Sequence, residues 1–259
     1  MRIRLWFYSA LISCILFAAI AVAVNSGGEV TEAIHSYDES IRNSVISHAS
    51  PELTKIALFF TYLANPEVVA AVFIFLLILL FIVHEFQIII FFLFGLAVGE
   101  GVIRLFKITF GRLRPEDFLA ITQGGYAFPS GHAFAAAMFY GFVGHGLFHL
   151  CKTTWQRVLV ILVTAELIIF IGLSRIVLGV HWPTDVLAGW LLGVAFLSSS
   201  IGLFHYFRNK NGHKKAIFQN KNYIRIGIIF TLLIFFIGYY YVTQSTELRS
   251  IGNSEVKQQ

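Results

Sequence analysis

Charged side chains are scarce in this sequence of 259 residues, in which 13% of the residues are Asp, Glu, Lys or Arg and 57% are hydrophobic. Soluble domains usually carry about 25% charged residues. So few charges cannot cover a surface that faces water. The composition therefore excludes an ordinary soluble domain and predicts an integral membrane protein whose outer surface mostly faces lipid.

Cysteine is almost absent. The chain has only Cys14 and Cys151, and these two residues are too few for a disulfide framework. Cys14 lies inside an apolar run and Cys151 at the end of another, so we predict unpaired thiols without a redox or metal-binding role.

An acidic balance is lacking as well, because the net charge is +5. A positive balance can indicate nucleic acid binding. Here, however, the Lys and Arg residues lie in short segments between apolar runs, as expected beside an anionic bilayer surface. The sequence predicts the membrane as a partner, and neither nucleic acid nor a protein partner.

Long apolar runs are what the sequence has in abundance, and a helix needs about 20 apolar residues to cross a bilayer. Seven candidate spans lie at 5–24, 67–83, 86–106, 132–150, 158–173, 186–204 and 224–243. The predicted fold is all-α, a polytopic membrane helix bundle of six core transmembrane helices plus a seventh. The run at 158–173 is short and must extend into its flanks.

The chain has no internal repeat and no long linker, which indicates one membrane core. We predict that 1–205 form this core and that 206–259 form a basic cytoplasmic loop, an additional transmembrane helix and a short tail. Within the core, the first span is predicted to be a retained anchor, and 25–66 an amphipathic interfacial segment ending in a short helix near Asn65.

Three polar segments carry most of the residues with an evident chemical use. They are Lys107 to Pro115, Pro129-Ser130-Gly131-His132, and Ser174-Arg175 followed by His181 and Asp185. The densest basic cluster, Arg208 to Arg225, predicts a cytoplasmic loop. With that orientation the three segments meet at the extracytoplasmic face.

The residue types in these segments suit phosphoryl transfer. Lys107, Arg114 and Arg175 offer permanent donors for a phosphate dianion. Ser130 and Gly131 fall where a helix begins, so unpaired backbone N–H groups there can also bind phosphate.

Two histidines complete this set. His181 has a carboxylate four residues on, in Asp185, which can orient the imidazole, so His181 is the predicted nucleophile. His132 is then the predicted general acid. We predict no metal and no cofactor in this site.

The three segments resemble the signature of the type-2 phosphatidic acid phosphatase family, whose site design is shared with vanadium-dependent haloperoxidases. They match the pattern Lys, six residues, Arg-Pro; Pro-Ser-Gly-His; and Ser-Arg, five residues, His, three residues, Asp at every position. The resemblance implies a phosphorylated His181 supported by Asp185, and leaving-group protonation by His132. It also implies phosphate binding by Lys107, Arg114, Ser130, Gly131 and Arg175.

By this resemblance the expected function is hydrolysis of a lipid phosphate monoester or diphosphate in a bacterial cell membrane. The candidate substrates are undecaprenyl diphosphate or another polyprenyl diphosphate, phosphatidylglycerol phosphate and phosphatidic acid. Two alternatives are a non-catalytic lipid-phosphate binding or transport protein that keeps the pocket, and a vanadium-dependent peroxidase. Turnover of a lipid phosphate separates the first alternative, and peroxidase activity with vanadate and a halide would indicate the second.

Other polar residues have a plain structural explanation. Glu100 and Arg104 are expected to form an intramembrane ion pair, and Arg112 either assists phosphate binding or is a solvated loop charge. His145 and His149 have the spacing of a helical metal pair. With no third ligand nearby in sequence, we expect no metal there.

Overall fold

The computed structural model describes residues 3–82, 86–116 and 123–210, and every regular element in these ranges is an α-helix. The all-α fold class is therefore confirmed. The helices are α1 (Ile3–Asn25), α2 (Gly28–Ser47), α3 (Pro51–Leu63), α4 (Pro66–Ile82), α5 (Phe86–Phe110), α6 (Gly131–Leu150), α7 (Thr154–Val177) and α8 (Pro183–Lys210).

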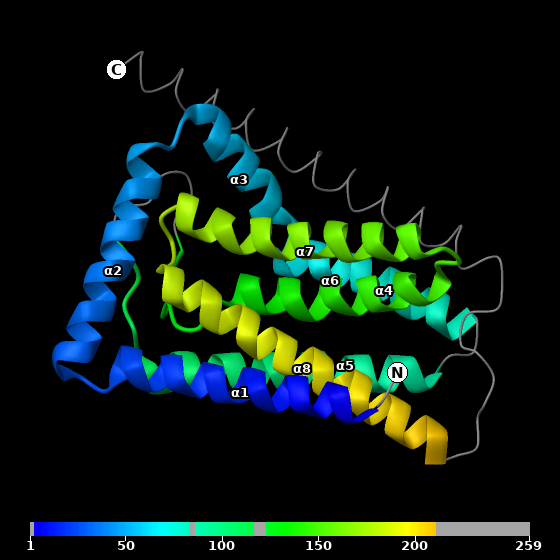
Figure 1. Cartoon of the computed structure of the whole chain (residues 1–259). Coiled ribbons are helices and arrows are strands. Elements are labelled where there is room, and N and C mark those ends of the chain that lie inside the picture. The colour runs from blue at the N-terminus through cyan, green and yellow to red at the C-terminus, as the bar shows by residue number, and fades with distance from the viewer. Residues whose placement is uncertain (1–2, 83–85, 117–122, 211–259) are drawn as a thin grey trace.

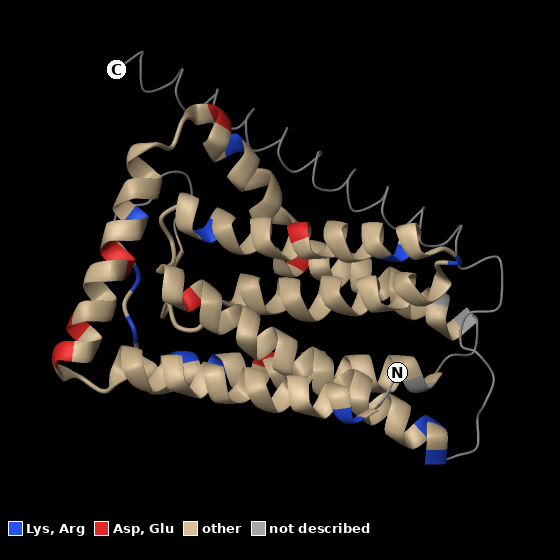
Figure 2. Ribbon diagram, in the orientation of Figure 1, with Lys and Arg blue, Asp and Glu red and all other residues tan. Residues whose placement is uncertain are grey.

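The long helices lie side by side, and α2 crosses one end of them (Figure 1). α8 packs against α1, α5 and α6, while α7 packs against α6 and α3. Lys, Arg, Asp and Glu are few in the middle of the long helices and more frequent on α2, α3 and at the helix ends (Figure 2). This distribution is the one that a bilayer around the bundle requires.

Five of these helices are long and apolar enough to cross a membrane, namely α1, α5, α6, α7 and α8. A sixth span arises if α3 and α4 are taken together, because they are bent by 45° at a short break. The short run at 158–173 does extend into its flanks, since α7 has 24 residues. The predicted seventh span lies outside the described residues, and the division at 205 stays a prediction.

The predicted amphipathic segment, 25–66, contains α2 and the short helix α3. Ser50 begins α3 by accepting a hydrogen bond from the backbone N–H of Leu53, and Pro51 occupies the first turn, where its missing N–H costs nothing. Pro66 starts α4 directly after the break. Asn65 is thereby placed at the bend between the two helices.

Two glycines let α8 approach α6 closely. A Cβ on Gly193 would lie 2.6 Å from the Cβ of Ala137 and 2.8 Å from the carbonyl oxygen of Phe134. A Cβ on Gly189 would lie 2.9 Å from the Cβ of Ala133. Small residues four apart are a common device for close packing of membrane helices. This packing holds the first turns of α6 and α8 together.

Gly193→Ala is accordingly expected to lower the thermal stability of the protein in detergent. The added methyl group meets the backbone and Cβ atoms of α6, which cannot move independently, and overpacking of this kind costs about 1–3 kcal/mol. Gly101→Ala is the matched control, because a Cβ there meets nothing within 4 Å. A thermal unfolding curve for Gly193→Ala that equals that of Gly101→Ala would contradict the proposed packing.

Candidate active site

The polar segments singled out in the sequence meet at one end of the bundle, beside α2 (Figure 1). Lys107 is in the last turn of α5, Gly131 begins α6, Arg175 is in the last turn of α7, and Asp185 is in the first turn of α8. His181 lies in the short connection between α7 and α8. Four helices thus contribute to one site.

His181 is held between an acceptor and a donor. Its Nδ1 lies 3.3 Å from Oδ2 of Asp185, and its Nε2 lies 3.0 Å from a guanidinium nitrogen of Arg114. A guanidinium group only donates, so Nε2 accepts and the proton of a neutral ring is on Nδ1. This arrangement leaves the Nε2 lone pair on the side of the cations, where an anionic substrate would bind.

Burial and charge keep this imidazole neutral. His181 is 1% exposed, and Asp185 is fully buried. Burial, and then the positive charges of Arg114, Arg175 and Lys107, hold the pKa of His181 well below its ordinary value. A neutral histidine is what nucleophilic attack needs.

The carboxylate of Asp185 has partners on both oxygens. Oδ2 also accepts a hydrogen bond of 2.9 Å from the backbone N–H of Trp182, and Oδ1 accepts one of 2.7 Å from Arg112. Its side chain therefore has little freedom to turn away from His181.

Lys107, in the last turn of α5, and Arg114, in the loop that follows, meet at the carbonyl oxygen of Tyr126. Nζ of Lys107 donates to the carbonyl oxygen of Tyr126 at 2.7 Å, and Arg114 donates to the same oxygen at 3.1 Å. Arg114 also donates to the carbonyl oxygen of Val180 at 2.7 Å. Both cations are thus anchored within reach of His181.

The first turn of α6 supplies further donors. Ser130 is the N-cap residue, with its hydroxyl accepting from the backbone N–H of Ala133, and its own N–H donates to the carbonyl oxygen of Asp185 at 2.9 Å. Nε2 of His132 lies 3.2 Å from Oδ1 of Asn65, at the bend between α3 and α4. This bond orients His132 from outside its own helix.

These residues border a cavity of about 510 Å³. Of the eight predicted site residues, the five that line it are Lys107, Arg114, Gly131, His132 and His181. Much of the remaining wall is apolar and comes from α4, α5 and α6, including Val69, Leu93, Leu96, Ala97 and Phe134. The cavity therefore combines a cationic end with an apolar one.

The other three predicted residues, Ser130, Arg175 and Asp185, are buried behind this wall. The guanidinium group of Arg175 donates to Thr61 and Gln123, and its Nε has no hydrogen-bond partner among the described residues. Gln123 does line the cavity. Direct contact between Arg175 and a phosphate group stays a prediction.

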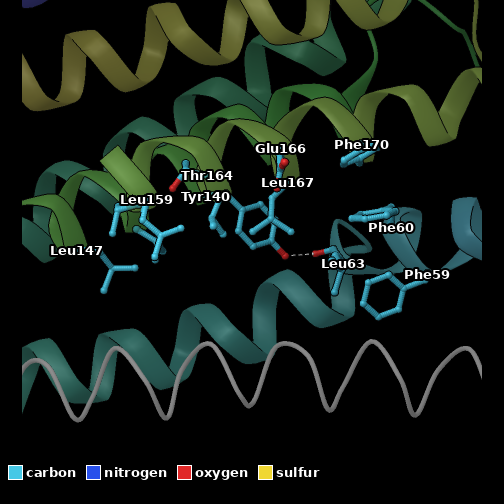
Figure 3. Close-up of a pocket in the computed structure, with 14 residues that line it drawn as sticks. Phe59, Phe60, Leu63, Tyr140, Leu147, Leu159, Thr164, Glu166, Leu167 and Phe170 are labelled. Carbon is cyan, nitrogen blue, oxygen red and sulfur yellow. Dashed lines mark hydrogen bonds between the residues drawn. The ribbon is translucent and has the colours of Figure 1, made fainter. Parts of the chain in front are cut away.

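A second cavity of about 460 Å³ lies between α3, α6 and α7 (Figure 3). Its wall is mostly apolar, with Glu166 at one side, and it contains none of the predicted site residues. The hydroxyl group of Tyr140 donates to the carbonyl oxygen of Leu63 at 2.8 Å there and ties α6 to the end of α3 (Figure 3). We assign no role in catalysis to this cavity.

Asp38 of α2, which is 1% exposed, is a further part of the site that was not among the predicted residues. Oδ2 of Asp38 accepts a hydrogen bond of 2.7 Å from Arg112, and Oδ1 accepts one of 3.0 Å from the backbone N–H of Thr184. Arg112 also donates to Thr184 and Asp185. Arg112 is therefore neither a solvated loop charge nor part of the cavity wall, but a link from α2 to Asp185.

Glu100 and Arg104 form the expected ion pair, with Nε of Arg104 3.4 Å from a carboxylate oxygen of Glu100. Both side chains are largely exposed, and both border the cavity that holds His181. Arg104 lies about one turn and Glu100 about two turns before Lys107 on α5, toward the apolar part of the cavity.

Comparison with known proteins agrees with this architecture. Residues 88–213 match the model of the PAP2 superfamily. The chain is 25% identical to phosphatidylglycerophosphatase B of Bacillus subtilis over 70% of this chain and 87% of that protein. It is 33% identical to undecaprenyl-diphosphatase of Sulfolobus acidocaldarius over 42% of this chain. This match covers about half (51%) of that relative's length.

A solved structure has the same fold. The crystal structure of a transmembrane PAP2-type phosphatidylglycerolphosphate phosphatase from Bacillus subtilis superposes with a TM-score of 0.64, covering 80% of this chain and 100% of that one at 24% identity. The family match at 88–213 spans all eight predicted site residues. Over this segment, which is just under half of its length, the chain is similar to the PAP2 superfamily, and it is an integral membrane phosphatase.

Proposed function

We propose that this protein hydrolyses the phosphate ester or diphosphate of a membrane lipid through a covalent phosphohistidine at His181. The observation that carries the proposal is the cavity that His181 borders. Its cationic end holds Lys107 and Arg114, while its other walls are apolar. A lipid has this same division between an anionic headgroup and an apolar chain.

Substrate binding uses the cationic end of the cavity. Lys107, Arg114 and the first backbone N–H groups of α6 surround the phosphate oxygens, and Arg114 can turn a donor from His181 to the phosphate. Apolar side chains such as Val69, Leu93 and Leu96 take the part of the lipid next to the headgroup.

The reaction has two steps. Nε2 of His181 attacks phosphorus, the bond from phosphorus to the leaving oxygen breaks, and His132 gives a proton to that oxygen. Water then attacks the phosphohistidine, His132 accepts a proton from this water, and the bond from phosphorus to Nε2 breaks. Asp185 stabilises the positive charge on the ring of His181 in both steps.

The substrate is proposed from the relatives. Phosphatidylglycerophosphatase B, undecaprenyl-diphosphatase and a lipid A 1-phosphatase of Porphyromonas gingivalis all resemble this chain, the last with 37% identity over 39% of this chain and 20% of that protein. Phosphatidylglycerol phosphate or a polyprenyl diphosphate is our first choice, and phosphatidic acid is the third candidate.

Phosphate release from purified protein tests this function. The protein in detergent is offered phosphatidylglycerol phosphate, undecaprenyl diphosphate and phosphatidic acid, with and without excess EDTA. We expect turnover of at least one lipid in both conditions, because Lys107 and Arg114 supply the positive charge at the phosphate. Lipid binding without phosphate release would instead indicate the non-catalytic alternative, and activity that EDTA removes and Mg²⁺ restores would refute the metal-free mechanism.

The acid limb of the pH profile of kcat/KM should lie below pH 6.5, the ordinary pKa of histidine. The lowered pKa keeps His181 neutral to a lower pH, and the rate falls only when protonation occupies Nε2. Lys107→Gln removes one of the charges that lower this pKa, so its acid limb should move to higher pH. The substrate titrates identically in both proteins, so only the enzyme differs between the two profiles. An acid limb at the same pH in the wild type and in Lys107→Gln would contradict the assignment of this limb to His181.

We also propose that the site faces away from the cytoplasm. Leu113, 77% exposed in the loop after α5, and Lys210, at the end of α8, lie at opposite ends of the bundle (Figure 1). Single cysteines at these positions, in a background without Cys14 and Cys151, should label differently in intact cells with an impermeant reagent. Labelling is expected at 113 and not at 210, and the reverse pattern would place the site in the cytoplasm.

A further inference from the structure

Three histidines gather at the end of the bundle opposite the active site. His145 and His149 lie one turn apart on α6, and His205 reaches the same place from α8. One ring nitrogen from each lies within 4.8 Å of the other two. At 1.5 Å per residue, this cluster is about 20 Å along α6 from His132, so it is a separate site.

The sequence offers no third ligand near His145 and His149, and the expectation of no metal there rested on that. His205 is distant in sequence, but α8 packs along α6 and brings it to the pair. The ring of His145 lies edge-on to both partners, with centroids 4.6 Å from His149 and 6.0 Å from His205.

We propose that this histidine cluster binds one Zn²⁺ ion, with His145, His149 and His205 as ligands. Three imidazoles suit zinc, whereas Mg²⁺ and Ca²⁺ require oxygen ligands. Tetrahedral zinc with bonds of about 2.0–2.1 Å separates its ligand nitrogens by about 3.3 Å. Binding of the ion therefore requires the three nitrogens, which lie within 4.8 Å of one another, to move closer together.

Three further features of the surroundings favour a cation with an open coordination position. His149 is in the last turn of α6, where the helix dipole is negative. Beside the cluster lies a cavity of about 380 Å³, lined by Trp6, His145 and His149 among others. The ring of Trp6 is 5.1 Å from that of His145, and its buried indole N–H has no acceptor within the described residues. A zinc-bound water would provide this acceptor and complete the coordination.

The expected consequence is mechanical rather than catalytic. Zinc would join α6 to α8 at the end where Lys210 lies, while the same two helices carry His132 and Asp185 at the other end. Binding to the folded state alone raises thermal stability. Phosphoryl transfer does not involve this ion, so the basal activity does not depend on it.

Zinc content per chain tests the proposal directly. Tag-free protein is stripped with a chelator, reloaded with Zn²⁺, passed over a desalting column and analysed for metal. We expect one zinc per chain in the wild type, in the exposed-histidine control His48→Gln, and in the active-site variant His132→Gln. His149→Gln and His205→Gln should bind zinc at least about 100-fold more weakly, because loss of a partner that only supports a ligand already costs 10- to 100-fold.

Phosphate release in EDTA checks the folding of His149→Gln and His205→Gln, since neither His149 nor His205 touches the catalytic cavity. X-ray absorption of the zinc-loaded wild type needs no variant and should show three imidazole ligands. The proposal is overturned if the wild type retains no zinc, if His205→Gln binds it as tightly as the wild type, or if His132→Gln loses it. An inactive protein that still binds zinc in the histidine cluster would refute the proposed function and leave this site standing.

Discussion

His181→Ala is expected to abolish formation of phosphoenzyme with every substrate, whatever its leaving group. The change removes a side chain whose nitrogen is both oriented by a buried carboxylate and directed at the cationic end of the cavity. Without a nucleophile, the first step has no acceptor for the phosphoryl group. Single-turnover labelling with a substrate that carries radioactive phosphate measures this step directly.

His132→Ala should act differently, because it removes only a proton donor. The loss matters in proportion to the basicity of the departing oxygen, so an alkyl phosphate should suffer far more than an aryl phosphate. General acid catalysis is typically worth 10²–10⁴-fold, and we expect a gap of at least about tenfold between the two substrates. Steady-state rates can hide this gap if phosphohistidine hydrolysis is slow, so the first step is again the one to measure.

His48→Ala serves as the control for these histidine changes, because His48 is exposed beyond the end of α2. The assigned roles are wrong if His132→Ala slows both substrates equally while His181→Ala still forms phosphoenzyme. Equal and complete loss in both variants would show that His132 is needed for more than protonation.

Much of the site could be predicted because its residues lie at fixed spacings near helix ends. Asp185 follows His181 by four residues with Pro183 between them, so the local turn alone brings carboxylate and imidazole together. Ser130 and Gly131 indicate the start of α6, because serine is a favoured N-cap residue. The alternation of apolar runs and basic segments likewise indicated the helices that bring these ends to one face.

The residues that could not be predicted act across large separations in sequence. Asp38 reaches Arg112 and Thr184 from α2, and His205 reaches the pair on α6 from α8. No local spacing reveals such contacts, because they depend on how the helices pack. The sequence does place Asp38 and Arg42 four residues apart in a segment of mixed polarity, but that both are buried is seen only in the structure.

The bend between α3 and α4 was only half anticipated. From the sequence we predicted that a short helix ends near Asn65, but also that 67–83 form a complete span by themselves. α4 has 17 residues in the described part of the chain, and by length and composition it gives a sixth candidate span when it is taken together with α3. The bend has a chemical consequence, because Asn65 there accepts the contact from His132.

Asp185→Asn is expected to lower the rate of phosphoenzyme formation by about 10²–10⁴-fold, with little effect on substrate affinity. An amide has the size of the carboxylate, but it carries no charge to stabilise the imidazolium ion and can turn its NH₂ group toward Nδ1. The ring would then place its proton on Nε2, where it blocks attack on phosphorus. Single-turnover rates, together with the substrate concentration that gives half the maximal rate, separate these two effects.

Asp38→Asn is the matched control for Asp185→Asn. Asp38 contacts the same Arg112, but through Oδ2 at 2.7 Å and without touching His181. Arg112 keeps its bond to Asp185 in this variant, so the imidazole keeps its orientation and charge partner. We expect a loss of no more than about tenfold, comparable to a weakened hydrogen bond in a partly buried network. If Asp38→Asn reduces phosphoenzyme formation as much as Asp185→Asn, then the network from α2 controls the nucleophile, and direct contact between Asp185 and His181 is not its main support.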